Sequence, residues 1–466
     1  MPFTSVSFIY YFLPLALLSY IIAPQRLKNP VLLGAGLVFF AWGEPKTGIF
    51  LFLLAFSGYL HGLWLEHNRN TRRPGLPLLS AIIFNTGLLF LLKFTDLGAN
   101  PASFFRAEPA LACIVLPLGL GVSTLQVFSY CIDLYRGRVS VQRNFLDFAT
   151  YACLFPPLIA GPIFPYRLAV AQIKERTHSW AETAAGIRTF ILGLARKVIL
   201  GNTLAQVGHT FARLDQPTVL FHWLAALAFL FQIYYDLSGY SDMALGLARI
   251  FGFRLPRNFN YPLLARSIVQ FWRRWFISLG AWFRDYVYEP LTGKAAGPGR
   301  RAISLLAIGA MLGLWHGGGW NLLVWGLVFA GLILLERLVL GKLLDRLPRV
   351  VGNLYVLLVL LLNFVLFRGP GLQEGLSNLQ AMLGLADLPW SSPETIFHLR
   401  SYSFTLLLAV IGATPLLSRL VARIRSSSAR ERVLNLLEPL VLSALLLLVT
   451  GYLTDGYFSP YAFFKF

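Results

Sequence analysis

The sequence predicts an all-α integral membrane protein that crosses the bilayer many times. Of its 466 residues, 56% are hydrophobic and only 13% are charged, whereas soluble proteins carry about 25% charged residues. The mean hydropathy is +0.64. The apolar runs are long and do not alternate at a period of two, which favours helices over an outer-membrane barrel.

We expect residues 1–466 to form a single integral domain of about 11 to 13 helical segments, some of them re-entrant or interfacial, around a central cavity. Within it we distinguish N-terminal helices (1–135), a motif-bearing core (136–345) and C-terminal helices (346–466). The first apolar run lacks a basic leader and a cleavage site, so we expect it to remain as a membrane helix.

The apolar runs place the spans in chain order. They lie near 6–23, 31–43, 48–66, 77–94, 111–134, 187–201, 218–250, 302–317, 321–340, 352–367, 401–418 and 433–453. The loops between them alternate between basic and non-basic. Because basic loops stay in the cytoplasm, this alternation predicts that the N-terminus and the tail 454–466 lie outside.

Segment 147–166 is apolar but contains four prolines. Prolines remove backbone donors and bend the chain, which is tolerated at membrane depth only where protein or water satisfies the freed groups. We therefore predict a broken or re-entrant segment that lines a cavity.

The net charge of +19 does not indicate nucleic-acid binding, because the Lys and Arg residues fall in loops and helix ends, as the positive-inside rule requires. Cys113, Cys131 and Cys153 lie in apolar sequence without ligand spacing. They predict neither a disulfide framework nor a metal site.

His316 is the strongest candidate for chemistry. It lies about 14 residues into a span that follows the basic loop 294–301, roughly 20 Å from the cytoplasmic end of the helix. An ionisable residue at that depth needs a partner or a watery cavity, so it indicates a functional site. Three glycines, residues 317–319, follow and are expected to end the helix. The alternative is a histidine that only bonds a neighbouring helix.

Asp236 and Asp242 lie inside an otherwise apolar span, within a cluster of hydroxyl and amide side chains. Buried carboxylates without partners cost several kcal/mol, so both are expected to be hydrogen-bonded to other helices, to an arginine or to water. We favour a structural role between helices over a role in orienting His316 or the acceptor.

Residues 266–286 fit one amphipathic helix along the cytoplasmic interface. Its apolar stripe consists of Ile268, Phe271, Trp272, Trp275, Leu279, Trp282 and Tyr286. Arg266, Arg273 and Arg284 fall on the opposite side, with Gln270 and Arg274 beside them. These arginines are expected to hold lipid phosphates, or alternatively the phosphates of a coenzyme A thioester.

Several motifs, in the same order along the chain, resemble the membrane-bound O-acyltransferase family and its bacterial alginate O-acetylation subgroup. They are residues 8–14 (FIYYFLP), 41–46 (AWGEPK), 116–121 (LPLGLG), 130–137 (YCIDLYRG), 158–163 (LIAGPI), 235–244 (YDLSGYSDMA), 270–279 (QFWRRWFISL), 313–321 (GLWHGGGWN) and 462–466 (AFFKF).

The resemblance implies an acyltransferase of the bacterial cytoplasmic (inner) membrane whose family histidine is His316. It implies transfer of an acyl group, usually acetyl, from acyl-CoA (acetyl-CoA) or another cytoplasmic thioester toward a hydroxyl acceptor outside, with no bound cofactor and no metal. Implied partners are membrane lipid, an acyl carrier and an envelope acetyltransferase (SGNH hydrolase-like) that completes O-acetylation of a polysaccharide. Asp236, Asp242, Asn321 and Trp315 are the candidates for supporting His316.

One position departs from the family pattern, which has a histidine where this chain has Phe276. Phenylalanine transfers no proton, so catalysis would depend on His316, or the chain is a divergent, inactive scaffold of an acetylation complex. A different class also fits the broken helices and intramembrane carboxylates, namely a lipid-linked sugar flippase or secondary transporter. The sequence leaves the acceptor open between alginate, another exopolysaccharide, peptidoglycan, teichoic acid and a lipid-linked sugar.

Overall fold

The computed structural model describes residues 1–42, 45–96, 118–214, 217–293, 297–316 and 319–455, and in these ranges the regular elements are all helices. Cys113, the motif 116–121 in part, residues 294–296, Gly317, Gly318 and the tail from 456 lie outside the described residues. The contacts divide the chain into two compact units. The expectation of one integral domain in three parts stays a prediction.

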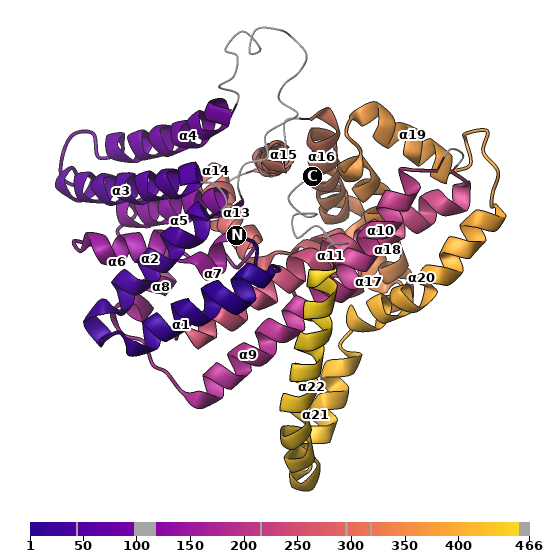
Figure 1. The fold of residues 1–466 in the computed structure, drawn as a ribbon. Helices are drawn as coiled ribbons and strands as arrows, with labels where there is room; N and C mark the ends of the chain where they lie inside the picture. The colour runs from indigo at the N-terminus through magenta and orange to yellow at the C-terminus, as the bar shows by residue number, and fades with distance from the viewer. Residues whose placement is uncertain (43–44, 97–117, 215–216, 294–296, 317–318, 456–466) are drawn as a thin grey trace. The chain divides into compact units, whose positions relative to one another are not determined.

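The first unit contains Met1–Ala110, Val115–Gly193 and Tyr240–Arg257. Its elements are η1 (Phe8–Phe12), α1 (Leu13–Ile22), η2 (Gln25–Leu27), α2 (Lys28–Ala41), α3 (Pro45–His67), α4 (Leu76–Asp96), α5 (Leu118–Tyr135), α6 (Phe145–Ala152), α7 (Phe155–Leu158), α8 (Tyr166–Lys174), most of α9 (Trp180–Ala195) and the end of α11 (Val219–Ile250) (Figure 1). Helix α3 packs on α2, α4, α5 and α6. Gly62 makes the close approach to α5 possible, because a Cβ there would lie 2.5 Å from the Tyr130 hydroxyl oxygen.

The proline-rich segment is broken as predicted. Helix α6 ends at Ala152, the short helix α7 follows, and residues 159–165 are not helical. Side chains satisfy carbonyl groups that the break frees: Ser123 donates to the Ala152 oxygen at 2.8 Å, and Tyr151 donates to the Phe164 oxygen at 2.9 Å. The segment is thus buried in the first unit, and its lining of a cavity stays a prediction.

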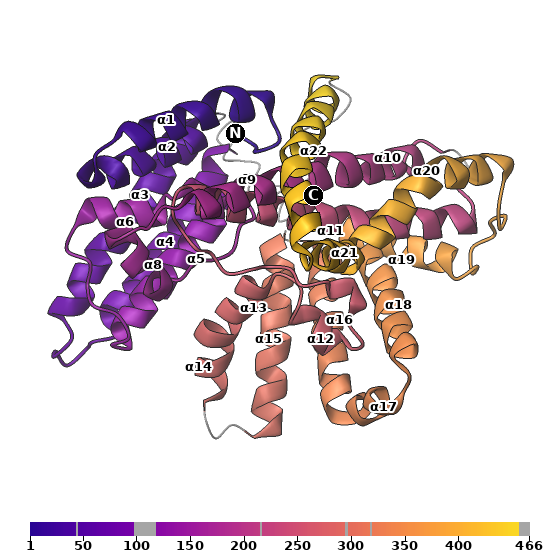
Figure 2. The same cartoon turned by 90° about the horizontal axis from the view of Figure 1, so that it is seen from below.

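Among the described residues, the second unit contains Leu194–Gly239 and the chain from Asn258 onward. Its elements are η5 (Arg196–Gly201), α10 (Asn202–Phe211), the first part of α11, η6 (Pro262–Leu264), α12 (Ile268–Trp272), α13 (Ile277–Phe283), η7 (Arg284–Tyr288), α14 (Glu289–Thr292), α15 (Pro298–His316), α16 (Trp320–Leu335), η8 (Glu336–Leu340), α17 (Gly341–Arg346), α18 (Arg349–Arg368), α19 (Leu372–Met382), α20 (Pro393–Gly412), α21 (Leu416–Arg425) and α22 (Ser428–Thr454) (Figure 2).

Six helical stretches within the described ranges are long and apolar enough to cross a membrane. They are Pro45–His67, Val219–Ile250, Trp320–Arg346, Arg349–Arg368, Pro393–Gly412 and Arg430–Thr454. Shorter apolar helices occur at Phe8–Ile22, Leu76–Leu89 and Phe145–Leu158. The predicted span 401–418 is displaced: α20 ends at Gly412, and residues 416–418 begin a separate helix after Pro415.

Helices α15 and α16 form a tightly packed hairpin (Figure 2). Gly309 and Gly313 on α15 face Gly326 and Leu322 on α16, and a Cβ on Gly309 would lie 2.6 Å from the Gly326 oxygen. Small residues four apart let two membrane helices approach until their backbones touch. This close packing fixes the end of α15, where His316 lies.

Candidate active site

His316 is the last residue of α15, as expected from the glycines that follow it. Its ring lies edge-on to two aromatic rings, that of Trp325 on α16 at 5.4 Å and 89° and that of Phe367 on α18 at 5.2 Å and 77°. In the part of the chain that the structure describes, neither ring nitrogen has a hydrogen-bond partner. The side chain is exposed. Ring contacts therefore orient His316, and no described residue engages its ring nitrogens.

An aromatic cluster joins His316 to the 270–279 motif. We define this aromatic cluster as Trp272, Trp325, Phe329, Phe364 and Phe367. The Trp272 ring lies 6.2 Å from Trp325 and 5.1 Å from Phe329, both nearly perpendicular. Such edge-to-face pairs at 4.5–7 Å are the preferred aromatic geometry. The two motifs that stand more than 30 residues apart in sequence thus meet on one set of rings.

Two indole N–H groups in this cluster are buried donors without an acceptor. Among the described residues, Nε1 of Trp272 and Nε1 of Trp325 have no hydrogen-bond partner. A buried donor left unpaired costs about 1–3 kcal/mol, so it needs an explanation. Neither group could be predicted from the sequence, because nothing in a sequence shows which indole nitrogens lack a partner.

The predicted continuous amphipathic helix over 266–286 is wrong. Helix α12 ends at Trp272, and α13 begins at Ile277 after Phe276, whose φ of 44° and ψ of 55° are left-handed. A left-handed residue cannot continue a right-handed helix. The turn is fixed from outside, since Ile277 donates its N–H to the Asn258 oxygen at 2.9 Å and Asn260 donates to the Arg274 oxygen at 3.0 Å.

Phe276 does not touch His316 by any ring contact in the described part of the chain. Its ring packs edge-on against Phe259 at 5.7 Å. Phe259 in turn packs on Trp275, with centroids 5.2 Å apart. The position where the family pattern has histidine is therefore linked through the Phe259 ring to Trp275, one residue earlier in the same motif.

A buried glutamate holds the start of α12. The backbone N–H groups of Ile268 and Val269 donate to the two carboxylate oxygens of Glu336, at 2.6 and 2.9 Å, and Ser267 accepts from the Gln270 N–H at 3.0 Å. Carboxylates at a helix N-terminus satisfy the free donors of the first turn. Glu336 lies inside the predicted span 321–340, and its role as a cap for a distant helix could not be read from the sequence.

The four arginines are separated by the break in the helix. Arg266, Arg273 and Arg284 are exposed and Arg274 is half-buried. Arg284 pairs with Asp285 at 2.7 Å. Within the described residues the other three have no carboxylate partner, and their role in binding donor or lipid phosphates stays a prediction.

Asp236 forms a buried ion pair that the sequence did not reveal. Its Oδ1 lies 2.7 Å from Nζ of Lys197 on η5, and both side chains are at most 1% exposed. Nζ of Lys197 also donates to Oδ1 of Asn202 at 2.7 Å. Gly201 leaves room for this pair, because a Cβ there would collide with Asp236. The pair joins η5 to α11, which agrees with a structural role.

The remaining predicted residues are distributed over both units. Asp242 is half-buried on the part of α11 that belongs to the first unit. The Asn321 amide is buried and donates to the carbonyls of Leu366 at 3.1 Å and Gly369 at 2.6 Å, so it ties α16 to the end of α18. Trp315, the residue that precedes His316, is half-buried.

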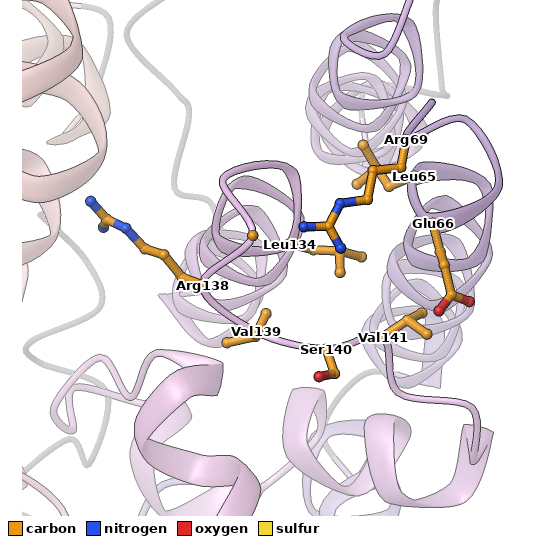
Figure 3. A pocket seen from close by; sticks show the side chains of 9 residues that line it. Leu65, Glu66, Arg69, Leu134, Arg138, Val139, Ser140 and Val141 are labelled. Atoms are coloured by element: carbon orange, nitrogen blue, oxygen red, sulfur yellow. The ribbon is translucent and has the colours of Figure 1, made fainter. Parts of the chain in front are cut away.

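A polar surface pocket of about 250 Å³ lies elsewhere, in the first unit, between the end of α3 and the turn after α5. Figure 3 shows the Arg69 side chain lying over Leu134, while Arg138 points away. Nη1 of Arg138 lies 3.7 Å from Oδ1 of the buried Asp133. The pocket contains none of the predicted site residues.

Comparison with known families decides the class of this protein. The model of the MBOAT, membrane-bound O-acyltransferase family matches residues 135–372, about half of the chain, including both motifs at the aromatic cluster. The chain belongs to this family. It is a multi-pass membrane protein and an O-acyltransferase.

Curated relatives agree over most of the chain. The probable alginate O-acetylase AlgI of Azotobacter vinelandii is 35% identical over 83% of this chain and 79% of its own length. The probable alginate O-acetylase AlgI of Pseudomonas aeruginosa is 36% identical over 82% of this chain and 75% of its own length. The peptidoglycan O-acetyltransferase of Helicobacter pylori is 30% identical over 82% of this chain and 80% of its own length.

Proposed function

We propose that this O-acyltransferase moves an acetyl group from a cytoplasmic thioester to a hydroxyl group of an envelope or exported polysaccharide, with neutral His316 as the general base. His316 takes the proton of the acceptor hydroxyl as its oxygen attacks the thioester carbonyl carbon. The C–S bond then breaks, and the departing thiolate receives the proton from His316. The acetyl ester and the free thiol are the products.

The observation that carries the proposal is the free imidazole of His316 at the point where the two motifs meet. A general base needs a ring nitrogen that is not already engaged, held in a fixed orientation. The contacts of His316 with Trp325 and Phe367 supply the orientation, and no described residue occupies its nitrogens.

The unpaired indole N–H groups support the same chemistry. Attack on a thioester carbonyl places negative charge on its oxygen, which needs preorganised donors. Trp325 contacts His316 directly, and Trp272 contacts Trp325. We infer that the Trp325 N–H donates to this oxygen and that Trp272 orients the Trp325 ring.

For the donor, the partners and the location, the support is family membership rather than geometry. We propose acetyl-CoA or another acyl thioester as the donor, the bacterial inner membrane as the location, and an acyl carrier and an envelope acetyltransferase (SGNH hydrolase-like) as partners. The relatives named for alginate and peptidoglycan support a polysaccharide acceptor.

The test uses the purified full-length protein in liposomes with radiolabelled acetyl-CoA, measuring thiol release and acetyl transfer to a soluble oligosaccharide. His316→Ala is expected to lower the rate by about 10²- to 10⁴-fold. Trp325→Phe keeps an aromatic ring at this position but replaces the indole by a smaller phenyl ring without the N–H, and is expected to lower the rate by about 10²-fold. His209→Ala, at an exposed histidine of the same unit, is the matched control and is expected to keep the wild-type rate.

Normal turnover by folded His316→Ala protein would overturn the assignment. The Phe276→His variant distinguishes the hypothesis of an active enzyme from that of an inactive scaffold. If the wild-type chain is inert and Phe276→His restores transfer, the native protein is a scaffold and the proposed activity is wrong. If the wild-type chain turns over and only His316→Ala abolishes it, a single histidine suffices.

A further inference from the structure

Helix α21 (Leu416–Arg425) is amphipathic over its whole length. At 100° per residue, Leu416, Leu417, Leu420, Val421 and Ile424 fall within an arc of about 140°. Arg419 and Arg423 lie 40° apart on the wheel, beside the Leu416 edge of this arc. None of the ten residues of α21 is buried, so both faces are uncovered by the described chain.

The flanking helices place α21 at the membrane surface. Helix α20 has 20 residues and is therefore about 30 Å long, the thickness of the hydrocarbon layer. Both α20 and Arg430–Thr454 are long and apolar enough to cross the bilayer. Since α21 begins four residues after α20 ends, it starts where the hydrocarbon gives way to headgroups.

Two contacts tie α21 to the rest of the second unit and leave its arginine pair free. Nη2 of Arg425 lies 3.2 Å from Oε2 of Glu438 on α22, and Figure 1 shows the two helices side by side. The Ser418 hydroxyl is 3.0 Å from the Tyr261 hydroxyl. Arg419 and Arg423 have no carboxylate partner among the residues described.

We propose that α21 is a binding site for anionic phospholipid headgroups. Arg419 and Arg423 contact lipid phosphates, and the five apolar side chains insert at the boundary between headgroups and acyl chains. An apolar face with cationic side chains beside it is typical of helices that lie in an anionic interface, because the arginines can reach the phosphates while the apolar face is inserted. The site is independent of His316 and of acyl transfer.

The site also connects lipid to the 270–279 motif. Tyr261, which bonds Ser418 on α21, follows Asn260, and Asn260 donates its N–H to the Arg274 oxygen. A lipid-bound α21 therefore holds the chain segment that closes the turn at Phe276.

Hydrogen–deuterium exchange of the full-length protein tests the proposal, in vesicles of phosphatidylcholine alone and of phosphatidylcholine with phosphatidylglycerol. A ten-residue helix is marginal in water, so its amides report binding directly. Each arginine near an anionic surface strengthens binding by about fivefold. We expect α21 amides to exchange roughly 25-fold more slowly in the anionic vesicles, and this difference to disappear in Arg419→Gln/Arg423→Gln.

Arg346→Gln/Arg349→Gln is the matched control, because it removes two exposed arginines from the end of α17 and the start of α18 in the same unit and is expected to keep the difference. Equal protection of α21 in both vesicle types would overturn the proposal, since apolar insertion alone would then explain binding. The proposal would also be overturned if the control variant lost the difference in exchange as completely as Arg419→Gln/Arg423→Gln does, because the total charge of the protein would then explain the effect. Unchanged exchange in α15 and α16 shows that each variant is folded.

Discussion

The Lys197–Asp236 pair permits a quantitative test of whether a buried carboxylate in this membrane protein serves structure or chemistry. At 2.7 Å, two unit charges attract by about 6 kcal/mol at an effective dielectric constant of about 20. Removing both ions from water costs several kcal/mol each, so the intact pair is close to neutral in net stability. Breaking it leaves one buried charge without compensation.

Lys197→Met and Asp236→Leu are each expected to destabilise the folded protein by about 3–5 kcal/mol, whereas Lys197→Met/Asp236→Leu is expected to lie much closer to the wild type. The measurement is reversible unfolding in mixed micelles, titrated with sodium dodecyl sulfate. A structural pair also predicts that the folded double variant keeps its acyl-transfer rate. If the double variant lost as much stability as the two single variants added together, the ion-pair reasoning would be refuted. A stable but inactive double variant would instead show a catalytic role.

Three further predictions concern Gly313 and Asn321 in the second unit and His178 in the first. Gly313→Ala places a Cβ against the α16 backbone and is expected to cost about 1–3 kcal/mol in thermal unfolding, whereas Gly331→Ala, which meets open space on α16, is expected to cost nothing. Asn321→Ala leaves two buried carbonyls without their donor and is expected to lose about 1–3 kcal/mol by the same assay. Burial lowers the pKa of His178, and the positive charges of Lys28 and Arg176 lower it further. The unfolded chain therefore binds a proton at this histidine more readily than the folded protein does. Stability should therefore fall as pH drops below about 6.5, and His178→Gln should flatten that part of a melting-temperature profile between pH 7.5 and 5.5.

Composition and periodicity predicted the parts of the fold that depend on local sequence. The density of apolar residues predicted a multi-pass helical protein, and the four prolines of 147–166 predicted its broken segment. The glycines after His316 predicted the end of α15. Each of these features is set by the conformational limits of the residues themselves, which can be read without knowing their neighbours.

The features that the sequence did not reveal depend on contacts between distant residues. Phe276 carries no turn signal, and its left-handed backbone is imposed by hydrogen bonds from 258–260. Lys197 stands 39 positions before Asp236, at the end of a predicted span, where a lysine is ordinary. The unpaired indole nitrogens of Trp272 and Trp325 result from packing that no periodicity encodes.

The backbone at Phe276 would accept a histidine without rearrangement. Positive φ is unfavourable for a bulky residue such as phenylalanine, whereas asparagine, aspartate and histidine adopt it several times more readily. The hydrogen bonds that impose this turn join main-chain atoms of 258–260 to those of Arg274 and Ile277, so they do not depend on the side chain at position 276. A histidine there would therefore relieve backbone strain that the phenylalanine bears.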